Sequence, residues 1–256
     1  MHIDTTGHGS DLVLIHGWAM HSGIFAPLTE RLAQRCRLHL VDLPGHGANR
    51  DYAAGALEPA ACAQAIAAAT PPAVWLGWSL GGLVALRGAL DRPDAVRGLV
   101  AIAANPRFVV GPDWPHGVEP DVLRAFADGL GSDYHATIER FLALETLGSP
   151  DAQRELRALR RQVFARGEPE AAVLCDGLAI LGSADLRAAL PALAMPSLWI
   201  AGRRDRLIPA AAMRWSAEQA PAARYLELPA GHAPFLSDPQ AVADAVADFV
   251  DAQVRA

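Results

Sequence analysis

Lysine is absent from this chain of 256 residues, and it has few cysteines and no long apolar run. All 22 basic residues are arginines, and the 28 aspartates and glutamates leave a formal net charge of −6. An acidic balance argues against non-specific binding to nucleic acid. No window approaches the roughly 20 uninterrupted apolar residues of a membrane-spanning helix. The first ten residues also lack the basic-then-apolar order of a signal peptide. We therefore expect a cytoplasmic protein that binds neither nucleic acid nor membrane.

Cysteine occurs at three positions, Cys36, Cys62 and Cys175. They are odd in number and far apart, and their spacing matches neither a disulfide framework nor a set of metal ligands. We interpret them as reduced thiols. We expect no metal site.

Apolar runs and helical patterns alternate along most of the chain. With 52% hydrophobic residues, the chain is long enough for one large core in a single domain. A helical pattern covers residues 24–35, and at most one short strand precedes Leu12. Short apolar runs stopped by turn signals predict strands at residues 12–15, 38–43, 74–76, 98–104, 197–202 and 224–228. This alternation predicts an α/β fold, a mostly parallel sheet with helices on both faces.

The alternation stops between residues 108 and 190, which we call the lid segment. It contains almost no strand-like run, and several helical patterns follow its Pro- and Gly-rich entry. We expect a helical lid inserted after the sixth strand, covering the carboxyl-terminal edge of the sheet, where α/β folds bind their ligands. The core of this single domain would then comprise residues 1–107 and 191–256.

One helix of the lid segment has marked ends. Ser149 is a candidate N-cap, Pro150 would take the first helical position, Asp151 lies in the first turn and Gly167 closes the end. Helical spacing places apolar residues on one face and basic residues on the other: Ala152, Leu156, Leu159 and Val163 against Arg154, Arg157 and Arg161.

The most informative motif lies in residues 73–82, which read AVWLGWSLGG. A buried strand that turns into a helix through Gly-x-Ser-x-Gly is the nucleophile elbow of α/β-hydrolases. Gly77 and Gly81 would let the backbone pass close to itself, and Ser79 would stand at the helix N-terminus. We therefore expect the α/β-hydrolase fold with Ser79 as nucleophile.

A serine nucleophile requires a base and an acid that orients the base, in the chain order Ser, acid, His. His232 fits the base, because it follows the last predicted strand. Asp205 fits the acid, because it follows the strand at 197–202, whereas the loop after 98–104 offers Asn105 and no carboxylate. An alternative role for Asp205 is a salt bridge to a neighbouring arginine: Arg203, Arg204 or Arg206.

Two main-chain N–H groups are candidates for the oxyanion hole. One belongs to Leu80, the residue after the nucleophile, and the other to Trp18, in the loop after the strand at 12–15. His16, in the same loop, is more suited to shaping the turn than to catalysis.

Five motifs give the chain a resemblance that covers nearly its whole length. They are Ile15-His16-Gly17-Trp18, Val41-Asp42-Leu43-Pro44-Gly45-His46-Gly47, Gly77-Trp78-Ser79-Leu80-Gly81-Gly82-Leu83-Val84, Glu139-Arg140-Phe141-Leu142-Ala143-Leu144 and Gly231-His232-Ala233-Pro234-Phe235. Together they resemble the carboxylesterases of biotin biosynthesis, which hydrolyse the methyl ester of pimeloyl-acyl carrier protein.

The resemblance implies catalytic roles for Ser79, Asp205 and His232, and an oxyanion site at Trp18 and Leu80. It also implies that the acyl chain contacts Phe141, Leu142, Ala143, Leu144 and Glu145. Arg140 and Arg157 match arginines that hold the acidic carrier protein in that family, while two further family positions are Ala136 and Gln153 here. From the charge of the lid helix we add Arg154 and Arg161. We expect a monomer that needs no cofactor.

Two other functions stay open. One is a serine esterase of broader specificity, or a C–C-bond hydrolase, on the same fold. The other is a binding module that kept the fold without turnover. Haloalkane dehalogenases and epoxide hydrolases fit less well, because they carry an Asp where this chain has Ser79.

Overall fold

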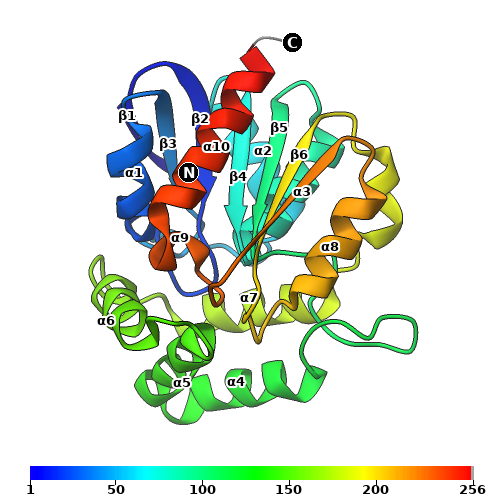
Figure 1. Ribbon diagram of the computed structural model, residues 1–256. Coiled ribbons are helices and arrows are strands. Elements are labelled where there is room, and N and C mark those ends of the chain that lie inside the picture. The colour runs from blue at the N-terminus through cyan, green and yellow to red at the C-terminus, as the bar shows by residue number, and fades with distance from the viewer. Residues whose placement is uncertain (255–256) are drawn as a thin grey trace.

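The computed structural model describes residues 1–254, and its centre is a twisted seven-stranded sheet (Figure 1). The strand order is β1-β3-β2-β4-β5-β6-β7. Only β1 is antiparallel to its neighbour β3, and the other neighbours pair in parallel. The strands are β1 (His2–Gly7), β2 (Ser10–Ile15), β3 (Cys36–Asp42), β4 (Ala73–Trp78), β5 (Val96–Ile102), β6 (Ser197–Gly202) and β7 (Ala223–Leu228).

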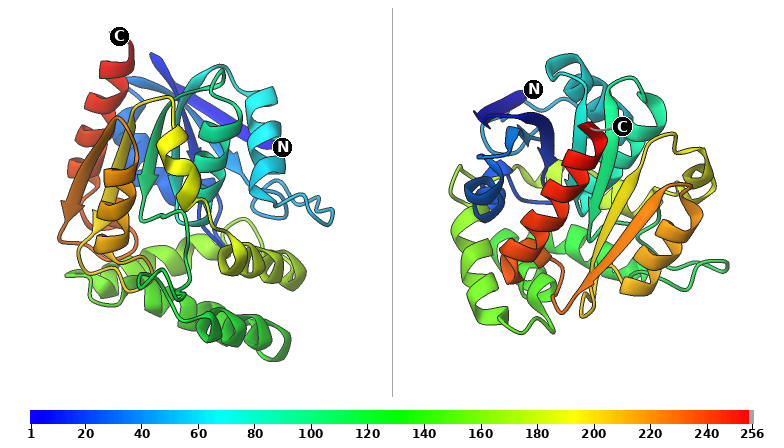
Figure 2. Two further views of the ribbon diagram at one scale, coloured as in Figure 1. Left: turned by 90° about the vertical axis from the view of Figure 1, so that its right-hand side faces the viewer. Right: turned by 45° about the horizontal axis from the view of Figure 1, so that its top comes forward.

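Helices cover both faces of this sheet. Figure 2 shows α1 and α10 on one side and α2 and α3 on the other. Every residue of β4 is buried, as expected for a parallel strand covered on both faces. The core helices are α1 (Ala26–Leu32), α2 (Pro59–Ala69), α3 (Leu80–Asp91), α8 (Ala210–Gln219), α9 (Pro234–Ser237) and α10 (Pro239–Val254), with the 3₁₀ turns η1 (Ser22–Phe25) and η2 (Arg187–Ala192). None of the helices described is both long and apolar enough to cross a bilayer.

Four helices lie below the sheet, at the edge where the parallel strands end (Figure 1). They are α4 (Pro120–Ser132), α5 (Tyr134–Thr146), α6 (Ala152–Val163) and α7 (Ala171–Ser183). All four fall within the lid segment. They follow β5, the fifth strand, so our prediction of the sixth was wrong by one. A single strand precedes β2, so the strand before the inserted helices is the fifth of the chain.

The predicted strands are confirmed with shifts of about two residues, and two helix boundaries were wrong. The helix expected at 24–35 is divided into η1 and α1, because Pro27 lies in the first turn of α1. Helix α6 begins at Ala152, and Ser149 is not its cap. The Ser149 hydroxyl donates instead to the buried Glu155 carboxylate, so it is not available to the helix amides. The expected burial of Leu159 and Val163 is confirmed.

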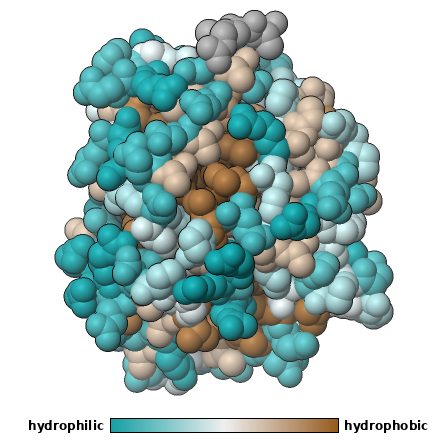
Figure 3. Space-filling view, viewed as in Figure 1, coloured by the Kyte–Doolittle hydropathy of each residue, from teal (hydrophilic) through white to brown (hydrophobic). Residues whose placement is uncertain are grey.

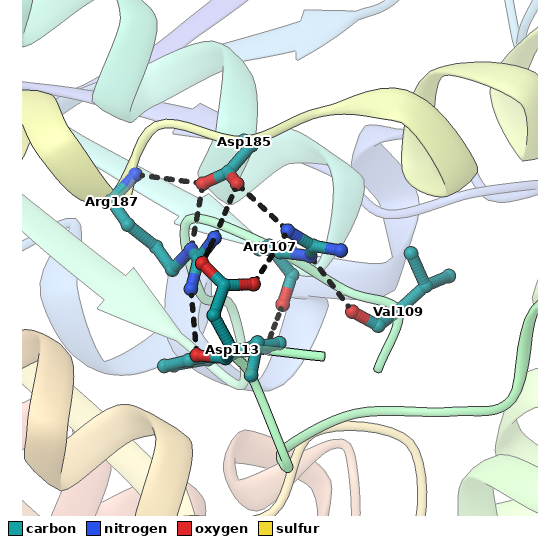
Figure 4. Close-up of polar contacts among 6 residues, drawn as sticks. Arg107, Val109, Asp113, Asp185 and Arg187 are labelled. Carbon is teal, nitrogen blue, oxygen red and sulfur yellow. Dashed lines mark hydrogen bonds and ion pairs between the residues drawn. The ribbon is translucent and has the colours of Figure 1, made fainter. Parts of the chain in front are cut away.

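The two ends of the inserted helices meet in a small polar cluster that we call the neck. The Leu186 amide donates to the Pro106 carbonyl at 2.9 Å. Figure 4 shows the side chains beside this contact. Arg107 donates to Asp185 at 3.0 Å, and Arg187 donates to both Asp185 and Asp113. The chain therefore leaves the core and returns to it at one place.

Candidate active site

The elbow between β4 and α3 holds Ser79 in a strained conformation. Its φ of 55° and ψ of −121° lie outside the regions that non-glycine residues prefer. The glycines on either side are required by space. A Cβ at Gly81 would lie 2.2 Å from the carbonyl oxygen of Ile15, and one at Gly77 would lie 2.2 Å from that of Gly81. The backbone therefore packs closely enough to present Ser79 at the start of α3.

The structure brings the three predicted triad residues together in one hydrogen-bonded chain. His232 Nε2 lies 2.9 Å from Ser79 Oγ, and its Nδ1 lies 2.8 Å from Asp205 Oδ2. Three parallel strands of the sheet supply these side chains from the loops at their carboxyl ends: Ser79 follows β4, Asp205 follows β6 and His232 follows β7. With the ring proton on Nδ1, donated to Asp205, Nε2 accepts from the Ser79 hydroxyl.

The environment favours this arrangement. Asp205 Oδ1 accepts from the amides of Leu207 and Ile208 at 2.8 and 2.9 Å, which orients the carboxylate. No arginine among residues 1–254 lies within 4.0 Å of it, so the alternative of an arginine salt bridge is wrong. Burial lowers the pKa of His232, but the charge and hydrogen bond of Asp205 outweigh it and raise that pKa above 6.5.

One further residue that we did not predict holds the histidine loop. Trp78, the second residue of the elbow motif, donates its indole N–H to the His232 carbonyl at 2.8 Å. A buried tryptophan needs an acceptor for its indole N–H. A tryptophan next to Ser79 could therefore have been predicted to donate a hydrogen bond to a neighbouring loop of the site.

The loop that carries Trp18 lies directly against the nucleophile. A Cβ at Gly17 would lie 3.2 Å from Ser79 Cβ. Within residues 1–254, neither the Trp18 amide nor the Leu80 amide has an acceptor, so both are available to a ligand. Their role in an oxyanion hole stays a prediction. His16 accepts the Leu43 amide and donates to the Gly17 carbonyl, and burial lowers its pKa to about 3. It is therefore neutral and has the turn-shaping place that we expected.

Helix α5 packs against the loops that carry Trp18 and His232. Phe141 packs on the Trp18 ring with centroids 4.4 Å apart, and Leu142 is also buried. Leu144 is half-buried. Ala143 is exposed, and its contact with the acyl chain stays a prediction. In a helix, Ala143 points away from the face that Phe141 and Glu145 share.

Glu145, the last residue of that predicted set, lies beside His232. Its carbonyl accepts from the His232 amide at 3.1 Å. Its side chain is buried, and Oε2 has no hydrogen-bond partner among the described residues. Burial raises the pKa of this carboxyl to about 8, with a smaller lowering by His232 and a raising by Asp205.

The predicted lid arginines differ in their surroundings. Arg154 is exposed, pairs with Asp151 at 2.7 Å and also contacts the carbonyls of α9, and its role in binding a carrier stays a prediction. Arg140 is exposed and donates to Thr137 at 2.9 Å. Arg157 and Arg161 are exposed, and neither has a carboxylate within 4.0 Å among residues 1–254.

Metal-ligating side chains do not gather in the part of the chain that the structure describes. No group of three or more His, Cys, Asp or Glu residues there could hold a metal ion.

Comparison with known proteins gives matches along nearly the whole chain. Residues 12–245 match a family model described as "Alpha/beta hydrolase family". A curated protein from Xanthomonas campestris pv. campestris (strain B100), "Pimeloyl-[acyl-carrier protein] methyl ester esterase", is 57% identical over 253 residues, covering 98% of this chain and 99% of its own. The protein of the same name from Stenotrophomonas maltophilia (strain K279a) is 56% identical, covering 98% and 97%.

Solved structures agree with the fold. An esterase from Exiguobacterium antarcticum superposes with a TM-score of 0.86 at 21% identity, covering 98% of this chain and 95% of its own. An enol-lactonase from Burkholderia xenovorans gives a TM-score of 0.84 at 21% identity, covering 98% and 96%. At such identity the likeness concerns the fold alone.

Proposed function

Because this chain belongs to the alpha/beta hydrolase family, we propose that it is a serine carboxylesterase that hydrolyses the methyl ester of pimeloyl-[acyl-carrier protein]. The observation that carries the proposal is a complete Ser79–His232–Asp205 hydrogen-bond chain in a protein 57% identical, over nearly its full length, to esterases of that name. The triad supports ester cleavage, and the relatives support the substrate.

The reaction proceeds in two steps through an acyl-enzyme. Ser79 Oγ attacks the ester carbonyl while its proton passes to His232 Nε2. The negative charge on the carbonyl oxygen is stabilised by the amides of Trp18 and Leu80, each worth about 100- to 1,000-fold in rate. His232 then gives the proton to the departing methoxide, and methanol leaves. In the second step His232 takes a proton from water, and the hydroxide attacks the acyl-enzyme carbonyl. As the bond to Ser79 Oγ breaks, His232 returns that proton to Oγ, and the free acid leaves as its carboxylate.

The surroundings of Ser79 suit an ester at the end of a long chain. Only 3% of its surface is exposed, so the ester must enter deep beneath the lid segment. The buried Phe141 and Leu142 then line the acyl chain, and the thioester to the carrier stays outside, away from the nucleophile. Residues 108–190 act as the lid in this proposal.

The partner is an acyl carrier protein, which is strongly acidic. Arg140, Arg157 and Arg161 are exposed arginines on α5 and α6 that suit an acidic surface. The proposal keeps the expectation of a cytoplasmic monomer without a cofactor, which cell fractionation and gel filtration test.

The decisive experiment measures release of free carboxylate from pimeloyl-acyl carrier protein methyl ester by mass spectrometry. Wild type should hydrolyse it, and Ser79→Ala should fold normally and lose more than about a thousandfold in rate. Turnover by the alanine variant would remove the elbow from the mechanism. Complementation of a biotin auxotroph that lacks this esterase tests the same activity in cells.

The two alternatives have their own tests. A panel of short-chain p-nitrophenyl esters, compared with the carrier-linked ester, separates a broad esterase from a selective one. A fluorophosphonate probe labels Ser79 only if the triad is active, which separates an enzyme from a binding module.

A further inference from the structure

Arginines without an acidic partner are unevenly distributed in this protein. Although acidic residues outnumber basic ones, several arginines within residues 1–254 have no carboxylate within 4.0 Å. They are Arg50, Arg97, Arg140, Arg157, Arg161, Arg203, Arg204, Arg206 and Arg224. Three of these fall within four consecutive residues of the loop after β6, which we call the acid loop (residues 203–209) because it carries Asp205.

The acid loop separates its side chains by charge. Asp205 points into the site and binds His232, whereas Arg203, Arg204 and Arg206 are exposed. Main-chain hydrogen bonds fix the loop, since the amides of Arg203 and Arg204 donate to the carbonyls of Leu228 and Ala230 at 2.8 and 2.9 Å. The three guanidinium groups are therefore presented from a well-held backbone at the edge of the sheet.

These arginines adjoin the lid segment. Arg204 Nη1 lies 3.4 Å from the carbonyl oxygen of Gly148, which is in the connection between α5 and α6. A Cβ at Gly148 would lie 3.9 Å from Arg206 Nε. Helix α6, on the far side of this connection, carries Arg157 and Arg161. Figure 3 shows strongly hydrophilic side chains gathered at the lower centre of this face, over the lower ends of β6 and β7.

The positive charges of Arg203, Arg204 and Arg206 repel one another. The chain has 28 acidic residues that could have paired with them, yet these three arginines have no acidic partner among residues 1–254. An acidic surface would remove this repulsion on contact and would also be steered toward the site by the summed field. The position beside the catalytic acid means that a partner bound here has its attached substrate close to the triad.

We propose that Arg203, Arg204 and Arg206 form a docking surface for the acidic carrier protein beside the α5–α6 connection, so that the carrier contacts the core and the lid segment at once. This inference rests on the proposed function, because it takes the carrier as the partner. It adds a core-side contact to the lid arginines. A carrier held on both sides of the α5–α6 connection is fixed in orientation as well as in position.

The test compares two double variants with the same change of charge. Arg204→Glu/Arg206→Glu alters the acid loop. Arg97→Glu/Arg224→Glu is the matched control, since both arginines are exposed, have no carboxylate within 4.0 Å among residues 1–254, and lie near the starts of β5 and β7, at the opposite end of the sheet. For each protein, kcat/KM is measured for pimeloyl-acyl carrier protein methyl ester and for p-nitrophenyl butyrate, and the first is divided by the second.

The ratio should fall at least about fivefold in the acid-loop variant and stay within about twofold of wild type in the control. Raising NaCl from about 50 mM to about 300 mM should lower the wild-type ratio and change that of the acid-loop variant less. A ratio that is unchanged in the acid-loop variant, including one where both activities fall together, would overturn the inference. An equal fall in the control would overturn it too, because net charge would then be the cause. If wild type cleaves p-nitrophenyl butyrate but not the carrier-linked ester, the proposed function itself fails.

Discussion

Replacing Glu145 by Gln should make this protein more stable, by an amount that increases with pH. The carboxyl is buried, its Oε2 has no partner within residues 1–254, and burial raises its pKa from 4.5 to about 8. The folded protein therefore keeps Glu145 protonated near neutral pH. The unfolded chain ionises it above pH 4.5.

The sign and size follow from this difference. Between pH 4.5 and 8 the Glu145 carboxyl is ionised in the unfolded state and protonated in the folded state. The free energy of unfolding therefore falls as pH rises through this range. Each pKa unit corresponds to about 1.4 kcal/mol. The cost of burying Glu145 is then about 1 kcal/mol at pH 5 and about 3 kcal/mol at pH 7. Glutamine has the same shape and does not ionise, so Glu145→Gln removes that cost.

Thermal unfolding followed by circular dichroism at pH 5, 6 and 7 measures the effect. For a protein of this size, about 1 kcal/mol shifts Tm by roughly 2–4 °C. The variant should therefore melt about 6–12 °C above wild type at pH 7 and only about 2–4 °C above it at pH 5. The increase of the gap with pH is the diagnostic result.

A second buried glutamate provides the control. Glu155 accepts hydrogen bonds from the hydroxyls of Ser149 and Ser237, the latter at 2.6 Å. Glu155→Gln should lower Tm, because both hydroxyls donate to the same oxygen, Oε1, and an amide oxygen is a weaker acceptor than a carboxylate oxygen. A Tm gap for Glu145→Gln that is constant from pH 5 to 7, or negative at pH 7, would refute the reasoning.

Three other outcomes are expected. Asp205→Asn should lower kcat on p-nitrophenyl butyrate by about 10⁴-fold, since His232 loses the carboxylate that fixes its tautomer, and a variant within tenfold of wild type would point to another acid. The wild-type rate should rise with pH through a pKa above 6.5, because the base must be neutral, and a flat profile would argue against it. Asp42→Asn should lower Tm more than Arg166→Gln, because buried Asp42 accepts from two loop amides as well as from the half-exposed Arg166; equal shifts would mean that the ion pair alone matters.

The parts of the site that were predictable are those that a short stretch of chain determines. The elbow needs two glycines where the backbone packs on itself, and that requirement is visible in the sequence around Ser79. Strand ends and chain order then left one position for the acid, Asp205, and one for the base, His232. The fold followed from the same alternation of apolar runs and helical patterns.

What was missed depends on contacts between distant segments. Ser149 has the residue type of a cap, but Glu155 is close enough to take its hydroxyl. The isolation of Glu145 could not be predicted either, because only the packing of α5 on the loop of His232 decides which polar groups it can reach.

The neck has a consequence for how such enzymes diversify. The Pro106 carbonyl accepts a hydrogen bond from the Leu186 amide, so the two ends of the segment between these residues are adjacent in the core. A longer, shorter or unrelated segment could connect these two adjacent ends without altering the strand order or the spacing of Ser79, Asp205 and His232. The inserted helices can therefore vary separately from the sheet that carries Ser79, Asp205 and His232.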